Sequence, residues 1–139
     1  MRLVIDTNVL ISALLSNVSV PAQLVELWRE GRFALLTSAE QVDELMRMTR
    51  YPKLRARLSA PLAGRLINEL RDLAEVVADL PRVEASPDPF DNHLLAAAVA
   101  GHADYLVTGD KSGLLVLKLF EGTRIVTVRD FLDLHGRWR

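Results

Sequence analysis

The sequence predicts an α/β protein, a three-layer α/β/α sandwich around a central, mostly parallel sheet of about five strands. Short runs of strand-type residues alternate with helix-type patterns along the chain, which is typical of parallel sheets covered by helices on both faces. The chain has 139 residues, so residues 1–139 are expected to form one domain. Half of the residues are hydrophobic, which supplies a sizeable core.

The predicted strands are short apolar runs bounded by polar or turn-forming residues. They lie at residues 2–5, 33–36, 75–77, 104–108 and 124–128. Stretches with helical patterning lie between the first four of them, and the connections are expected to be right-handed.

The first three helices are predicted from periodicity and from start and stop signals. One follows the first strand directly, at residues 7–15. The next begins near Pro21, which suits a first turn, and ends before Gly31. Ser38 and Gln41 have the spacing of a capping box, in which each side chain binds the other residue's backbone N–H, and the helix that they open is expected to reach about Arg50.

The later helices have equally clear boundaries. Pro52 ends the preceding helix. A helical region follows over about 54–73, with a break near Pro61. Asp88 is expected to cap a helix that has Pro89 in its first turn and Gly101 after its end. Residues 129–135 form the last short helix.

The composition and the N-terminal sequence exclude several kinds of site and of cellular location. The chain has no cysteine, which excludes disulfides and thiolate metal sites and fits a reducing cytoplasm, so a cytoplasmic location is expected. The N-terminus loosely resembles a signal peptide, but Asp6 and Asn8 interrupt its apolar stretch. No run of 18 apolar residues exists, so no membrane span is expected.

Basic residues are concentrated in one region although the net charge is only −1. The stretch from Met46 to Arg71 contains seven Lys and Arg residues and only one acid, Glu69. Such a region can bind the phosphates of a polyanion, and the alternative is an ordinary solvated helical arm. The candidate RNA-binding residues are Arg47, Arg50, Lys53 and Arg55.

Four acids from separate segments are expected to meet at the carboxyl edge of the sheet, where ligands of open parallel sheets bind. Asp6 and Asp110 each follow a strand. Asp91 lies in the first turn of a helix, on its packed face. Glu44 borders the apolar stripe of another helix, one turn after Glu40, a second candidate for the same place. Asp104 precedes its strand and belongs at the opposite edge.

Each acid also has a structural explanation. Asp91 can stabilise a helix N-terminus, Asp110 can belong to a turn, and Glu44 can lie on an exposed helix face. Asp6 is the hardest to explain in this way, because apolar residues flank it on both sides. His93 lies about 200° around its helix from Asp91 and is expected to be a surface or capping residue.

Convergence of the acids would favour a metal ion. Two carboxylates 4 Å apart repel by about 4 kcal/mol at an effective dielectric of 20. An all-oxygen ligand set without cysteine favours Mg²⁺ or Mn²⁺, which can activate water for phosphodiester cleavage. The residues expected to hydrogen-bond the carboxylates or their waters are Thr7, Asn8, Asn92 and Thr108.

Three stretches closely resemble PIN domains, in particular the small VapC-like toxins of prokaryotic toxin–antitoxin systems. They are VIDTNVLISALL, SAEQVDELMRMTRYPKL and DPFDNHLLAAAVAGHADYLVTGDKSGL. The resemblance covers nearly the whole chain and implies a metal-dependent ribonuclease. Its four acids map to Asp6, Glu44, Asp91 and Asp110. Position 92 is often a second acid in this branch but is Asn92 here, which reduces the charge available for a second metal.

The resemblance also implies roles and partners. Asp6, Asp91 and Asp110 would bind Mg²⁺ or Mn²⁺, and Glu44 would complete the metal shell or orient the attacking water. The substrate would be RNA. The protein would form a homodimer and pair with a small antitoxin protein, whose arginine could enter the acidic site.

Three alternative functions stay open. The fold could serve as a non-catalytic module that binds RNA or protein, although all four acids are present. The chain could instead be a housekeeping RNA-processing nuclease. Other Mg²⁺-dependent phosphoryl-transfer domains, such as receivers and haloacid-dehalogenase-like phosphatases, fit less well, because the phosphatase pattern requires an aspartate at the position of Asn8.

Overall fold

The computed structural model describes residues 1–109 and 113–135. Its strands are β1 (Arg2–Ile5), β2 (Ala34–Thr37), β3 (Glu75–Val76), β4 (Tyr105–Val107), β5 (Leu119–Phe120) and β6 (Thr123–Val126). Its α-helices are α1 (Thr7–Leu15), α2 (Val20–Arg29), α3 (Ala39–Thr49), α4 (Pro52–Arg55), α5 (Ala60–Leu73), α6 (Asn92–Ala100) and α7 (Val128–Leu134). Two short 3₁₀ helices are η1 (Pro89–Asp91) and η2 (Leu114–Leu117).

The strands form one sheet in the order β3-β2-β1-β4-β6-β5. All neighbouring pairs are parallel except β5 and β6. This confirms the predicted α/β class with a mostly parallel sheet. The additional strand β5 was not predicted. It is joined to β6 by Glu121 and Gly122, whose φ angles of 49° and 85° are typical of a tight hairpin turn.

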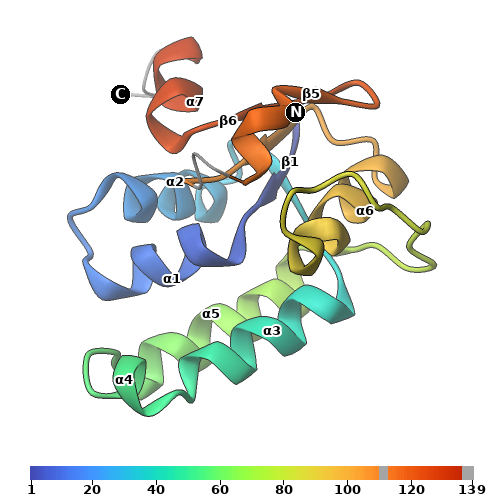
Figure 1. The fold of residues 1–139 in the computed structure, drawn as a ribbon. Helices are drawn as coiled ribbons and strands as arrows, with labels where there is room; N and C mark the ends of the chain where they lie inside the picture. The colour runs from blue at the N-terminus through green and yellow to red at the C-terminus, as the bar shows by residue number, and fades with distance from the viewer. Residues whose placement is uncertain (110–112, 136–139) are drawn as a thin grey trace.

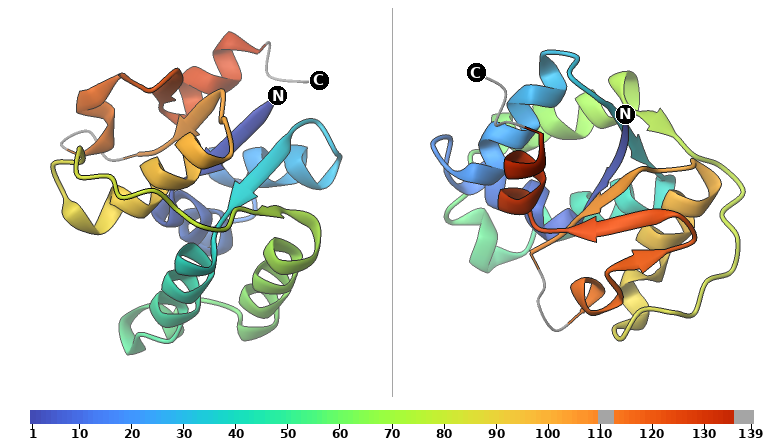
Figure 2. Two further views of the ribbon diagram at one scale, coloured as in Figure 1. Left: turned by 90° about the vertical axis from the view of Figure 1, so that its right-hand side faces the viewer. Right: turned by 90° about the horizontal axis from the view of Figure 1, so that it is seen from above.

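Helices cover both faces of the sheet, as expected for a three-layer sandwich (Figures 1 and 2). Helices α1, α2 and α7 lie on one face, and α6 lies on the other. Alternate residues of β1 supply the two cores: Leu3 and Ile5 pack into the first, and Val4 packs into the second.

Helices α3 and α5 form an antiparallel arm that extends beyond the sheet, with α4 at its tip (Figure 1). Apolar residues such as Leu45 and Leu66 bury the inner faces of the arm against the core beside α1. The break that was predicted near Pro61 lies just before it. Ser59 accepts a hydrogen bond from the backbone N–H of Leu62 and caps α5, and Pro61 occupies the first turn.

The capping box predicted at the start of α3 is only half formed. The Ser38 hydroxyl accepts the backbone N–H of Gln41 at 3.1 Å, as expected. The Gln41 side chain, however, turns inward, where its Nε2 donates to the carbonyl of Ile5 at 2.6 Å and its Oε1 accepts from Thr37 at 2.7 Å. A buried polar side chain needs partners, and β1 and β2 offer them. Gln41 therefore joins α3 to the carboxyl edge of the sheet.

No single helix in the described ranges has the length and hydropathy of a membrane span. Helices α1 and α2 reach these values only when they are counted together, and they are bent by 102° at their junction.

Replacement of either of two glycines by alanine is expected to change the stability of the protein, in opposite directions at the two positions. A Cβ on Gly101 would lie 2.6 Å from Leu36 Cδ1 and 3.1 Å from the carbonyl oxygen of Ala97, so Gly101→Ala overpacks the second core and lowers the free energy of unfolding by about 1–3 kcal/mol. A Cβ on Gly64, inside α5, meets no atom within 4 Å. Gly64→Ala therefore raises the free energy of unfolding by about 0.5–1 kcal/mol. Urea unfolding checks both. A stabilising Gly101→Ala would contradict the packing at this site.

Candidate active site

The carboxyl ends of β1 and β4 meet at the point where the strand order reverses. The chain proceeds from β1 outward to β2 and β3, and then crosses to β4 on the other side of β1. In open parallel sheets, a crevice for ligands forms at such a point. Asp6 follows β1 and Thr108 follows β4, so the two residues lie at this edge of the sheet, as predicted from the sequence.

Asp6 is buried, with 2% of its surface exposed. Its Oδ2 accepts the hydroxyl of Thr108 at 2.7 Å, and its Oδ1 accepts the backbone N–H of Asn8 at 3.1 Å. Asp6 is also the N-cap of α1, where the free N–H groups of the first turn favour a negative charge. The fold therefore holds a buried carboxylate in place at the edge where a ligand would bind.

Glu44 is brought to the same edge by contacts between three helices. The hydroxyl of Thr7, in the first turn of α1, donates to Glu44 Oε1, and Nε2 of His93, in α6, lies 3.3 Å from the same oxygen. The side chain of Glu44 is only 19% exposed. Glu40 is exposed in the first turn of α3, so the geometry favours Glu44 over Glu40 as the second acid.

The ionised form of Glu44 is stabilised by its neighbours. Burial raises the pKa of Glu44, but His93, the Thr7 hydroxyl and the charge of Arg47 together outweigh burial. They hold the pKa below its ordinary value of 4.5. Glu44 is therefore a carboxylate at neutral pH.

His93 lies in a different environment from the one that the sequence predicts. It was expected at the surface or in a cap, but its side chain is 17% exposed and lies against Glu44. The face of α6 that carries His93 lies against α3, where Nε2 of His93 is 3.3 Å from Oε1 of Glu44. The periodicity of α6 shows which residues share a face but not which helix packs against that face. The contact between His93 and Glu44 could therefore not be predicted from the sequence of α6.

Asp91 and Asn92 lie at the junction of η1 and α6. Asp91 is half-buried and occupies the N-cap position of α6. The side-chain oxygen of Asn92 accepts the backbone N–H of Ser86 at 2.9 Å and so holds the loop before η1. Asn8 is exposed beside Asp6 and contributes its backbone N–H. Asn92 thus has a structural hydrogen bond where the resemblance places a possible ligand.

The fourth predicted acid, Asp110, lies outside the described residues. Within residues 1–109 and 113–135, no three His, Asp or Glu residues lie close enough to hold a metal ion. The metal-binding roles of Asp6, Glu44, Asp91 and Asp110 therefore stay predictions. Asp104 lies at the opposite edge, as expected, where its carboxylate accepts the backbone N–H of Arg2 at 2.8 Å.

The basic region lies on the arm that α3 and α5 form. Four of its cations, the predicted RNA-binding residues, are exposed and form no ion pair with the described residues: Arg47, Arg50, Lys53 and Arg55. Arg65, by contrast, lies 3.6 Å from Glu69, the one acid of this region. Unneutralised cations therefore gather along α3 and α4, and Arg47 is close enough to Glu44 to influence its pKa.

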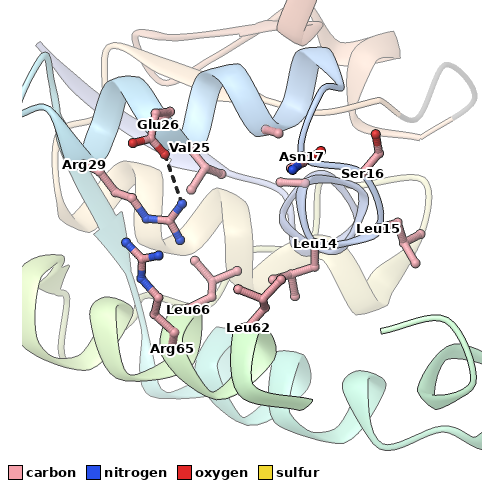
Figure 3. Close-up of a pocket in the computed structure, with 12 residues that line it drawn as sticks. Leu14, Leu15, Ser16, Asn17, Val25, Glu26, Arg29, Leu62, Arg65 and Leu66 are labelled. Atoms are coloured by element: carbon pink, nitrogen blue, oxygen red, sulfur yellow. Dashed lines mark hydrogen bonds and ion pairs between the residues drawn. The ribbon is translucent and has the colours of Figure 1, made fainter. Parts of the chain in front are cut away.

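A pocket of about 620 Å³ lies between α1, α2 and α5, and none of the predicted acids lines it. Leu14, Leu62 and Leu66 form part of its apolar wall, with Arg29 and Arg65 facing each other above them (Figure 3). Arg29 binds both carboxylate oxygens of Glu69 at 2.8 Å and so ties α2 to α5. The pKa of Arg29 is raised by this bond to Glu69.

Comparison with known families gives one match. Residues 2–112 match the family described as PIN domain. A comparison with curated proteins finds no match. The matched range contains Asp6, Glu44, Asp91 and Asp110 and the strands that end at the crevice, and it covers well over half of the chain.

Stability should depend on pH through Glu44. A carboxyl whose folded-state pKa is lowered adds stability that is fully present above its unfolded pKa and is lost as the pH falls through the folded value. Glu44→Gln should therefore lower the free energy of unfolding at pH 7, and the difference from wild type should shrink as the pH falls below about 4.5. Urea unfolding in EDTA between pH 7 and pH 3.5 measures this difference. A difference that stays constant over this range would contradict the lowered pKa.

Proposed function

Because the chain belongs to the PIN domain family, we propose that it is a Mg²⁺- or Mn²⁺-dependent endoribonuclease. PIN domains are generally nucleases, and this chain has the acids that such chemistry requires. The observation that carries the proposal is the buried carboxylate of Asp6 at the carboxyl edge between β1 and β4, where Thr108 and the first turn of α1 hold it.

The donor atoms of the candidate ligands are of the kind that a hard cation prefers. The groups that bind Asp6 and Glu44 include hydroxyl and amide groups, and the candidate metal ligands carry only oxygen donors. Asp6, Asp91 and Asp110 would hold the ion, and Glu44 would complete the ligand set or orient the attacking water. When bound, Mg²⁺ or Mn²⁺ would supply an activated water and neutralise charge on the phosphate.

The protein groups around the site position these acids. Thr108 holds one oxygen of Asp6, and the first turn of α1 holds the other through the N–H of Asn8. Thr7 holds Glu44. Side chains fixed in this way need little reorganisation when the reaction begins, which is how preorganised sites lower an activation barrier.

The exposed cations of α3 and α4 would bind the RNA backbone. Arg47 lies one helical turn from Glu44, so a strand of RNA bound along Arg47, Arg50 and Lys53 would lead toward the acids. Such contacts attract any polyanion and do not read its sequence. We propose RNA as the substrate from the resemblance to VapC-like proteins.

The same resemblance supports a cellular role. We propose that the protein is the toxin of a toxin–antitoxin pair in the cytoplasm, acts as a homodimer and is inhibited by a small antitoxin protein. A housekeeping RNA-processing nuclease of the same fold would have the same site, so the cellular role is tested separately from the chemistry.

Asp6→Asn should abolish cleavage without unfolding the protein. Asparagine is as good an N-cap as aspartate, so α1 should keep its start. Loss of a metal ligand should reduce cleavage of a mixed panel of structured RNAs by more than about 100-fold, because changes beyond the ligands alone typically cost 10–100-fold. The assay compares Mg²⁺, Mn²⁺ and EDTA.

Asp104→Asn is the matched control, because it makes the same chemical change at the opposite edge of the sheet and should leave cleavage unchanged. Equal cleavage by wild type and Asp6→Asn, or cleavage that persists in EDTA, would overturn the proposed mechanism. Growth arrest on expression of wild type but not of Asp6→Asn would support the toxin role.

The exposed cations should account for the salt dependence of RNA binding. Arg50→Gln with Lys53→Gln should weaken binding and reduce the slope of log affinity against log salt by about 1.4, since each phosphate contact to a single strand contributes about 0.7. The control is Arg32→Gln with Arg124→Gln, which removes the same charge at the amino edge of the sheet. Fluorescence anisotropy of a labelled RNA, measured in Ca²⁺ or EDTA, gives both slopes. Equal slopes for the two double variants would contradict the arm as the RNA contact.

A further inference from the structure

We infer that His93 is a positioning residue that fixes the carboxylate of Glu44 for the reaction. This inference rests on the proposed nuclease function and adds to it a residue outside the four acids and the hydroxyl and amide groups beside them. It is carried by the contact that α6 makes with α3 across the crevice.

One oxygen of Glu44 is held from two sides. Oε1 accepts the hydroxyl of Thr7 and faces Nε2 of His93 at 3.3 Å. The pair does not have the geometry of a hydrogen bond, and a rotation of the ring with a hydrogen on Nε2 would form one. Oε2 has no hydrogen bond or ion pair with the described residues. The arrangement therefore leaves one oxygen of Glu44 for a water or an ion.

The contacts fix Glu44 to three separate parts of the fold. Thr7 belongs to the first turn of α1, directly after Asp6, and His93 belongs to the first turn of α6, directly after Asp91 and Asn92. Gln41 extends the same network, since its Nε2 lies 3.4 Å from the Thr7 hydroxyl and donates to the Ile5 carbonyl. Any displacement of Glu44 would break contacts to the two helices that carry the other acids.

His93 is a poor choice for packing alone. Both ring nitrogens are sealed from water, and neither has a hydrogen-bond partner in the described part of the chain. Buried polar atoms without partners destabilise a fold, and an apolar side chain of similar volume would fill the space between α6 and α3 without that penalty. A contact that weakens packing and touches a candidate catalytic acid is expected where function requires it.

Two variants separate positioning from packing. His93→Leu retains apolar volume but removes the donor, and His93→Gln returns an amide N–H to about the place of Nε2. His93→Leu should lower kcat about 10–100-fold, the range typical of groups that orient ligands, with KM for RNA unchanged and a melting temperature equal to or above that of wild type. His93→Gln should regain most of the lost kcat.

A second readout needs no activity. Carbon-13 relaxation of the Glu44 side chain, recorded in EDTA, should report one ordered carboxylate in wild type and in His93→Gln, and increased motion in His93→Leu. This measurement decides whether His93 positions Glu44 even if wild type cleaves none of the RNAs, a result that would count against the proposed nuclease instead.

The inference is overturned by any of three results. His93→Leu could retain wild-type kcat. It could lose kcat and melting temperature together, with no recovery in His93→Gln, which would indicate a structural role only. The Glu44 side chain could be equally ordered in all three proteins, which would show that Thr7 alone positions it.

Discussion

The position of β1 between β2 and β4 is the constraint on which the rest of the structure depends. Parallel pairing on both sides brings three strand ends to one edge, and the N–H of Asp6 extends that pairing by donating to the carbonyl of Val107 at 2.9 Å. A carboxylate at this point is buried whatever its function, so it requires donors. Thr108 and the first turn of α1 supply them. The geometry that builds the core thus also builds the candidate site.

The two sides of helix α3 have different surroundings. Its inner side binds the sheet through Gln41 and brings Glu44 to the crevice. Its outer side presents Arg47 and Arg50 to solvent, and neither forms an ion pair with the described residues. The arm is anchored elsewhere, where Arg29 and Glu69 join α2 to α5. That ion pair involves none of the exposed cations near Glu44.

The site also shows how stability and function can conflict within one contact. The buried imidazole of His93 forms no hydrogen bond in the described residues, although its neighbour Glu44 is stabilised as a carboxylate. An apolar side chain between α3 and α6 would give a more stable fold than the imidazole, because it would leave no buried polar atom without a partner. The same region holds the half-buried Asp91.

The sequence by itself determined the fold class, the order of strands and helices along the chain and the edge of the sheet at which Asp6 lies. These depend on local periodicity and on the rule that parallel strands end at the same edge. Helix α1 matches its predicted range, and the family match agrees with the motifs around Asp6, Glu44 and Asp91. Only the tertiary structure decided that Gln41 turns inward, that β5 pairs with β6 and that His93 faces Glu44. Each depends on which element packs against which, and no pattern within a single helix or strand contains that information.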